Sequence, residues 1–149
     1  MNIALASDHG GFDYKKILIP YIEKLGHTVI DFGCPDDQSC DYSDFATPAC
    51  GAVQKGECER AILICGTGIG MSIAANKLHG IRCALCGDVL SARFTREHND
   101  TNALAMGGRI IGIETAKAIV DVWLSTAFHA DEIRHRRRLD KIAALDRAR

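Results

Sequence analysis

Cys65 stands at the end of an apolar run and is followed by three glycines in alternation, Gly66, Gly68 and Gly70. Glycines let an anion approach backbone N–H groups, and the N-terminus of a following helix directs a positive partial charge at the same point. Such a turn could hold a developing oxyanion. The same field would stabilise a thiolate and make Cys65 a base or nucleophile. A buried structural thiol is the alternative, but it leaves the glycine turn without a purpose.

The glycine pattern does not match the common nucleotide-binding motifs. A dinucleotide-binding motif would need its third glycine at position 71, where Met71 stands, and no Gly-Lys-Ser/Thr ending follows. The glycines alone are therefore a weak signal. Their value comes from Cys65 before them.

Asp8 and His9 form a second polar pair, directly after the apolar run at the start of the chain and before two glycines. The glycines let the backbone turn tightly into a helix, whose N-terminus favours an anion. Asp8 could be only the cap of that helix, the common role of an aspartate there. Because His9 adjoins Asp8 and both follow a strand, a functional role for the pair is an equally good interpretation.

His98 lies in a dense polar segment, Arg96–Asn102, which precedes another apolar run. An imidazole titrates near neutral pH, which suits a general acid or base. A structural or exposed histidine is the alternative, because Asn99 and Asp100 are also typical of helix ends and turns.

Basic residues gather after the last apolar run and near the C-terminus. Arg109 follows two glycines and suits a phosphate, and the segment Arg134–Arg138 holds four arginines and a histidine. That segment could be a solvated helix face, a nucleic-acid patch or an anion clamp. On a helix, Arg134 and Arg138 share a face and could grip one phosphate, with a neighbouring protomer completing the clamp.

The composition limits the classes of function. With 149 residues, 47% of them hydrophobic, the chain is expected to form one domain over residues 1–149. A net charge of -1 gives no field that would attract nucleic acid or an anionic membrane. No segment approaches the roughly 20 apolar residues of a membrane span, and no charged leader is evident. We therefore expect a soluble, cytoplasmic protein without nucleic-acid or membrane partners.

The seven cysteines are an odd number, and only Cys83 and Cys86 have a metal-like or redox-like spacing. In a strand these two thiols would point to opposite faces, which argues against a chelate or a disulfide. Most of the cysteines are then expected to be buried structural thiols, and no metal site is expected.

Short apolar runs alternate with longer segments of helical period, the pattern of βαβ units on a parallel sheet. Strands are expected at 2–7, 28–32, 60–65, 82–86 and 103–106. Helices are expected near 11–25, 44–55, 70–77, 89–97, 114–124 and 133–147, and the polar segment 33–43 is expected to be a loop overhanging the site. Ligands of such sheets bind beyond the carboxyl ends of the strands.

Six segments stand out together: Asp8–Gly11, Asp41-Tyr42, Ile64–Lys77, Gly80–Arg82, Glu97–Asn102 and Arg134-His135-x-x-Arg138. This set resembles the B-type ribose-5-phosphate isomerases and the related galactose-6-phosphate isomerases. The resemblance implies a Rossmann-like α/β/α sandwich with a five-stranded parallel sheet and a C-terminal helix that reaches a partner subunit. It also implies a homodimer or dimer of dimers with the active site at the subunit interface, and neither metal nor cofactor.

The implied reaction interconverts D-ribose 5-phosphate and D-ribulose 5-phosphate through a cis-enediolate, in the pentose phosphate pathway. The resemblance assigns the C2 base to Cys65 and the opening of the furanose ring to His98, helped by Asp8. The remaining matches are the enediolate cradle (Gly66, Thr67, Gly68, Ile69, Gly70), the substrate contacts (Asp8, His9, Tyr42, Asn99) and the phosphate ligands (Arg109, Arg134, Arg138). Some members carry a glutamate base on the helix after the turn, but Met71–Ala75 has no carboxylate, so the cysteine subclass is matched.

Two alternatives remain open at this level. The chain could isomerise another sugar phosphate, such as allose 6-phosphate, galactose 6-phosphate or a tetrose phosphate, because the chemistry is the same. It could also be a catalytically silent sugar-phosphate-binding regulator, since fold alone does not fix function. The presence of both Cys65 and His98 favours an enzyme.

Overall fold

The computed structural model describes residues 1–148, in which every expected strand and helix is present with ends within two residues of those expected. The strands are β1 (Asn2–Ser7), β2 (Thr28–Asp31), β3 (Arg60–Cys65), β4 (Cys83–Leu85) and β5 (Ala103–Gly107). The helices are α1 (Phe12–Lys24), α2 (Tyr42–Gln54), α3 (Ile69–Ala75), α4 (Val89–Asn99), α5 (Ile113–Ser125) and α6 (Ile133–Arg147). Across the described residues, no helix has the length and apolar character needed to span a bilayer.

The strands form one parallel sheet in the order β2-β1-β3-β5-β4. The chain moves outward from β1 to β2 and returns with β3 on the other side of β1, so the order reverses between β1 and β3. Ligands of such sheets bind at this reversal, beyond the carboxyl ends of the strands. The register pairs Ser7 with Ile64 and Cys65 with Gly107, which brings the ends of the three central strands together.

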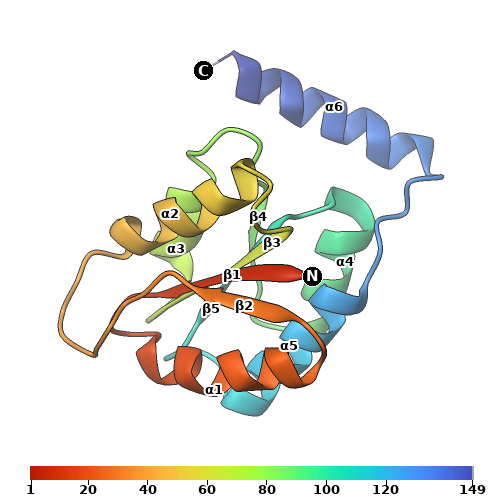
Figure 1. Cartoon of the computed structure of the whole chain (residues 1–149). Helices are drawn as coiled ribbons and strands as arrows, with labels where there is room; N and C mark the ends of the chain where they lie inside the picture. The colour runs from red at the N-terminus through yellow and green to blue at the C-terminus, as the bar shows by residue number, and fades with distance from the viewer. Residues whose placement is uncertain (149) are drawn as a thin grey trace.

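Helices cover both faces of the sheet (Figure 1). Along β3, Ile62 and Ile64 pack into a core with α1, α4 and α5, whereas Leu63 and Cys65 pack into a second core with α2 and α3. This alternation follows from the pleat of a strand. Trp123 of α5 is the largest fully buried side chain. The predicted three-layer sandwich is confirmed.

Cys83 and Cys86 point to opposite faces of the sheet, as strand geometry predicted. Cys86 belongs to the core beneath α1, α4 and α5, and Cys83 packs against the core beneath α2 and α3. The two thiols therefore lie on opposite sides of the sheet. All seven cysteines are free thiols.

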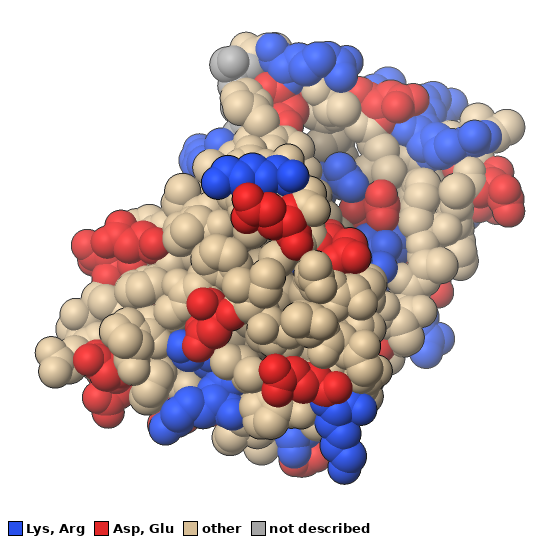
Figure 2. All heavy atoms as spheres, viewed as in Figure 1, with Lys and Arg blue, Asp and Glu red and all other residues tan. Residues whose placement is uncertain are grey.

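Helix α6 stands off from the layers (Figure 1). One end lies near α4, and at the other the Asp146 carboxylate accepts the N–H of Gly80 and lies 3.3 Å from His79. Both contacts are at the amino ends of strands, so α6 bridges that edge of the sheet. A cavity of about 700 Å³ separates α6 from β4, and Figure 2 shows the hollow beneath the basic residues of the helix. Ile142 and Leu145 line this cavity and are nevertheless exposed.

Candidate active site

Cys65 ends β3 and is 4% exposed. The N–H of Gly68 donates a hydrogen bond to its sulfur at 3.0 Å. Gly68 has φ 78°, and a Cβ added there would overlap a methyl carbon of Leu85. Both the conformation and the close packing therefore require glycine. The turn directs a backbone donor at the sulfur, an arrangement that stabilises negative charge on it.

The remainder of the glycine turn leads into α3 and lies under Tyr42. The hydroxyl of Thr67 accepts the N–H of Ile69 at 3.2 Å. Tyr42 begins α2, and its ring covers Gly70 so closely that a Cβ there would lie 2.7 Å from a ring carbon. The first N–H groups of a helix have no partner within it, so those of α3 can bind an oxyanion.

Asp8 and His9 face the same edge of the sheet from the end of β1. The Asp8 carboxylate accepts the N–H groups of Gly10 at 2.8 Å and Gly11 at 3.2 Å. The N-cap of α1 is Gly11, so Asp8 closes the turn before the helix and does not cap it. Nδ1 of His9 accepts the N–H of Cys40 at 3.3 Å, which places the proton of a neutral ring on Nε2.

Arg109 completes this cluster from the end of β5. Its N–H donates to the carbonyl of Gly66 at 2.9 Å, and its side chain runs beside Gly66, 3.4 Å from where a Cβ would stand. A Cβ on Gly10 would lie 2.8 Å from the Gly66 nitrogen, so the turns after β1, β3 and β5 are in contact. One edge of one chain thus gathers a thiol, a carboxylate, an imidazole and a guanidinium around a glycine turn. We call this set (Asp8, His9, Tyr42, Cys65, Gly66–Gly70, Arg109) the carboxyl-edge cluster.

The described residues hold no group of three or more His, Cys, Asp or Glu side chains that could bind a metal ion. The carboxyl-edge cluster offers a thiol, a carboxylate and an imidazole, which can transfer protons, and a guanidinium, which can bind an anion.

His98 lies elsewhere, in the last turn of α4. Its ring is stacked between Phe94, at a centroid distance of 4.9 Å, and His135 of α6, at 4.6 Å. His135 is buried and its Nδ1 has no hydrogen-bond partner among the described residues. Burial, followed by the charge of His98, lowers the pKa of His135. Arg134 pairs with Glu132 at 3.3 Å, at the start of the same helix.

The predicted site residues are divided between two edges of the sheet. Helix α4 runs back from the carboxyl end of β4, so His98 and Asn99 lie near the amino end of β5. Residues 103 and 107 of β5 pair with Ala61 and Cys65, respectively. At the usual rise of a strand, these four steps span about 13 Å. Within one chain, the structure therefore does not bring His98 to Cys65.

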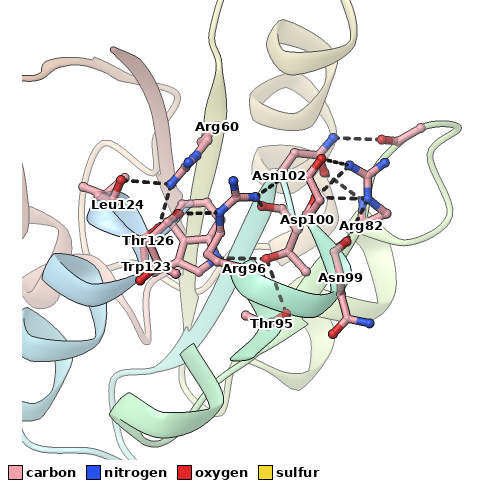
Figure 3. Close-up of polar contacts among 12 residues, drawn as sticks. Arg60, Arg82, Thr95, Arg96, Asn99, Asp100, Asn102, Trp123, Leu124 and Thr126 are labelled. Carbon is pink, nitrogen blue, oxygen red and sulfur yellow. Dashed lines mark hydrogen bonds and ion pairs between the residues drawn. The ribbon is translucent and has the colours of Figure 1, made fainter. Parts of the chain in front are cut away.

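A network of arginines around the segment that follows α4 was not predicted as part of the site (Figure 3). Arg60 of β3 donates to the carbonyls of Trp123 at 2.6 Å and Leu124 at 3.1 Å. Burial, and then the charge of Arg96, lowers the pKa of Arg60 to about 10. Arg82 and Arg96 hold the chain that follows α4. In the sequence these arginines stand only at the starts of strands and within a polar segment. Such positions are too common to predict a network.

Comparison with known proteins identifies the family. A family model described as Ribose/Galactose Isomerase matches residues 3–142. Ribose-5-phosphate isomerase B of Escherichia coli is 44% identical over 147 residues, covering 99% of this chain and 97% of that protein. The solved structure of ribose-5-phosphate isomerase B from Clostridium thermocellum has a TM-score of 0.96, is 47% identical and covers 99% of both chains.

A third relative has been solved with a bound sugar phosphate. The solved structure of ribose-5-phosphate isomerase B from Mycoplasma genitalium with bound ribulose-5-phosphate has a TM-score of 0.93 and 36% identity, and covers 98% of this chain and 96% of that one. The chain belongs to the ribose/galactose isomerase family. It is an isomerase with the fold of its ribose-5-phosphate isomerase B relatives.

Proposed function

We propose that the chain interconverts D-ribose 5-phosphate and D-ribulose 5-phosphate, as a step of the pentose phosphate pathway. The observation that carries this proposal is the N–H of Gly68 directed at the buried sulfur of Cys65. The names of the relatives and the ribulose-5-phosphate bound to one of them support the choice of sugar. We further propose that residues 1–149 act as one domain in the cytoplasm, which agrees with the seven free thiols.

The proposed chemistry is a proton transfer between neighbouring carbons of the open-chain sugar. The Cys65 thiolate removes the proton from C2, and the electron pair of that C–H bond forms a cis-enediolate with its charge on O1. The proton of the C2 hydroxyl passes to O1, and the thiol returns its proton to C1, which leaves the ketose. Thr67 and the N–H groups of the glycine turn stabilise the enediolate, and donors of this kind contribute about 3–4 kcal/mol each.

The other residues bind the sugar phosphate or open its ring. Asp8, His9, Tyr42 and Asn99 contact the sugar in this proposal, and Asp8 assists His98 in opening the furanose. The phosphate is held by three guanidiniums, Arg109, Arg134 and Arg138. No metal ion or cofactor takes part.

We propose that the active site is shared between two copies of the chain, because His98 and Cys65 lie at opposite edges of the sheet. An isologous dimer would set the amino edge of one protomer against the carboxyl-edge cluster of the other. The exposed apolar side chains of α6, Ile142 and Leu145, and the cavity beneath them give such a dimer apolar surface to bury. His98, Asn99, Arg134 and Arg138 then come from the partner subunit.

The function is tested by kcat/KM for ribose 5-phosphate against six-carbon and four-carbon sugar phosphates, with conversion followed by NMR. The expected result is the highest kcat/KM for ribose 5-phosphate. A higher value for allose 6-phosphate, galactose 6-phosphate or a tetrose phosphate would replace the proposed substrate. Binding without turnover of any of them would indicate a silent regulator.

The shared site is tested by mixing two inactive variants, Cys65→Ala and His98→Asn, under conditions that allow protomers to exchange. In a mixed dimer, one of the two sites combines an intact Cys65 with an intact His98. Random exchange then restores about a quarter of the wild-type activity. If exchange is demonstrated by mass and activity stays at the level of the separate variants, His98 does not act across an interface.

A further inference from the structure

Helix α4 ends at Asp100, which adopts a left-handed conformation with φ 43° and ψ 49°. It is the one non-glycine residue of the described chain with a positive φ. Glycine is the usual residue at such a position, and another residue costs about 1–2 kcal/mol there, although aspartate tolerates it better than most. Aspartate at this position brings a carboxylate that glycine would lack.

The carboxylate is held by two guanidiniums from different elements (Figure 3). Nη1 of Arg96, within α4, donates to one oxygen of Asp100 at 2.8 Å, and Nη2 of Arg82, just before β4, donates to the other at 3.2 Å. The Arg96 side chain is 7% exposed, and those of Arg82 and Asp100 are 31% and 37% exposed. The guanidinium of Arg96 is thus shielded from water, whereas the carboxylate of Asp100 keeps partial access to solvent, and charge-assisted hydrogen bonds of this kind are stronger than neutral ones.

The same two guanidiniums also hold three consecutive backbone carbonyls. Arg82 donates to the carbonyl of Asn99 at 3.2 Å and to that of Asp100 at 2.7 Å. Arg96 donates to the carbonyl of Thr101 at 2.6 Å. Carbonyls at the end of a helix have no donor within the helix, and cations favour that end. The chain from residue 99 to residue 101 is thereby fixed against both α4 and the start of β4.

The network is anchored in the core of the protein. Trp123 of α5, which is fully buried, donates its Nε1–H to the hydroxyl of Thr101 at 2.9 Å. Nε of Arg96 donates to the carbonyl of Thr126, after α5, at 3.4 Å. Asp100 therefore links the end of α4 to a rigid part of the fold.

The residues fixed in this way are those that the proposed function places in the partner's active site. His98 and Asn99 are the last two residues of α4. The side chain of Asn99 points away from the guanidiniums in Figure 3, while its backbone carbonyl is held by Arg82. Arg82 thus holds the backbone of Asn99 by its carbonyl, and the Asn99 side chain remains available for another contact.

We propose that Asp100, clamped between Arg82 and Arg96, is a positioning residue that sets the direction of His98 and Asn99 toward the substrate bound by the partner subunit. The proposal rests on the proposed function. Asp100 touches no reacting atom. It acts by holding the last turn of α4 in one conformation, and a misplacement of about 1 Å at a catalytic group can cost about 100-fold in rate.

The test compares Asp100→Asn and Asp100→Gly with wild-type protein. Both replacements tolerate a positive φ, so the backbone conformation is kept. Asparagine retains one oxygen that can accept from a guanidinium, whereas glycine retains none. Tyr21→Phe is the matched control, because it removes the hydrogen bonds of Tyr21 to Asp121 between α1 and α5, away from α4.

The readout is kcat for the conversion of ribose 5-phosphate, compared with the rate at which ribulose 5-phosphate exchanges its C1 proton with solvent deuterium. Ribose 5-phosphate is mostly a closed furanose and needs its ring opened, whereas ribulose 5-phosphate cannot close because its O5 carries the phosphate. The ratio of kcat for ribose 5-phosphate to the rate of C1 exchange in ribulose 5-phosphate is expected to fall by about 10- to 100-fold in Asp100→Gly. A smaller fall of this ratio is expected in Asp100→Asn. In Tyr21→Phe the ratio is expected to stay unchanged, however much Tm is lowered.

A role in stability alone predicts a lower Tm with an unchanged ratio in both Asp100 variants, and that result overturns the inference. If the Asp100 variants do not fold, Arg82→Lys replaces them, because lysine keeps the charge but cannot hold the carboxylate and the carbonyls together. An unchanged ratio in this folded variant overturns the inference as well. Wild-type protein that is inactive in both directions would instead refute the proposed function.

Discussion

Replacing Cys65 with serine separates the proposed proton transfer from the architecture of its site. The serine hydroxyl fits the space of the thiol and can accept the N–H that Gly68 donates to the sulfur at 3.0 Å. The buried donor therefore keeps a partner, and the expected change in the free energy of unfolding is about 1 kcal/mol or less. A serine hydroxyl ionises far less readily than a thiol, so the variant lacks a base.

The loss of rate can be bounded from the role assigned to the thiolate. A positioned general base contributes about 100- to 10,000-fold, which corresponds to about 3–5 kcal/mol of activation free energy. No hydrogen bond of the Cys65 side chain other than that from Gly68 is present among the described residues. Since the thiolate acts only in the transition state, KM should change by no more than about twofold and kcat/KM should fall with kcat.

The measurement is the exchange of the sugar's C1 and C2 protons with solvent deuterium, followed by NMR, beside steady-state kinetics and thermal unfolding. The expected Cys65→Ser protein is folded, binds the sugar phosphate and exchanges both protons about 100- to 10,000-fold more slowly than wild type. A folded variant whose kcat stays within about tenfold of wild type would mean that another group removes the proton.

Three further changes test other parts of the structure. Gly68→Ala forces a left-handed alanine against Leu85, so Tm should fall by at least about 4 °C together with kcat, and a wild-type Tm would contradict the assigned packing. Arg138→Ala should mainly raise KM, and an unchanged KM in steady-state assays would remove this arginine from the phosphate site. The pKa of His135 lies below its ordinary value of 6.5 because of burial and then the charge of His98, so the contribution of this group to stability is present above pH 6.5 and lost as pH falls below it. His135→Phe should therefore show a shallower fall of Tm between about pH 7 and about pH 5 than wild type, and an equal slope would contradict this account.

Most of the fold could be predicted because local patterns determine it. The continuous apolar run of β3 predicts a strand buried on both faces, and the pleat then places Ile62 and Ile64 toward one helical layer and Leu63 and Cys65 toward the other. The glycine turn after Cys65 was predictable for the same reason, since glycines at a strand end serve a local conformation. The grouping of Cys65 with Asp8 followed from the general geometry of parallel sheets.

The parts that could not be predicted depend on contacts between distant segments. Asp100 looks like an ordinary turn residue in the sequence, and only the meeting of Arg82 with the end of α4 gives its carboxylate a partner from another element. The position of His135 against His98 depends on the path of the irregular segment before α6. Cys40 reaches His9 across a loop whose composition carries no such signal.

The division of the proposed site between two edges of the sheet has a consequence for how the catalyst behaves in solution. A solitary chain carries one proton-transfer half and one ring-opening half that cannot meet, because they lie at opposite ends of the same strands. Turnover per molecule would then fall with dilution and recover on concentration, and the order of the rate in protein would rise from one toward two as dimers dissociate. Each protomer would also be both donor and recipient, so a variant altered in one half would lose both sites as a homodimer but only one of the two sites when paired with a wild-type protomer.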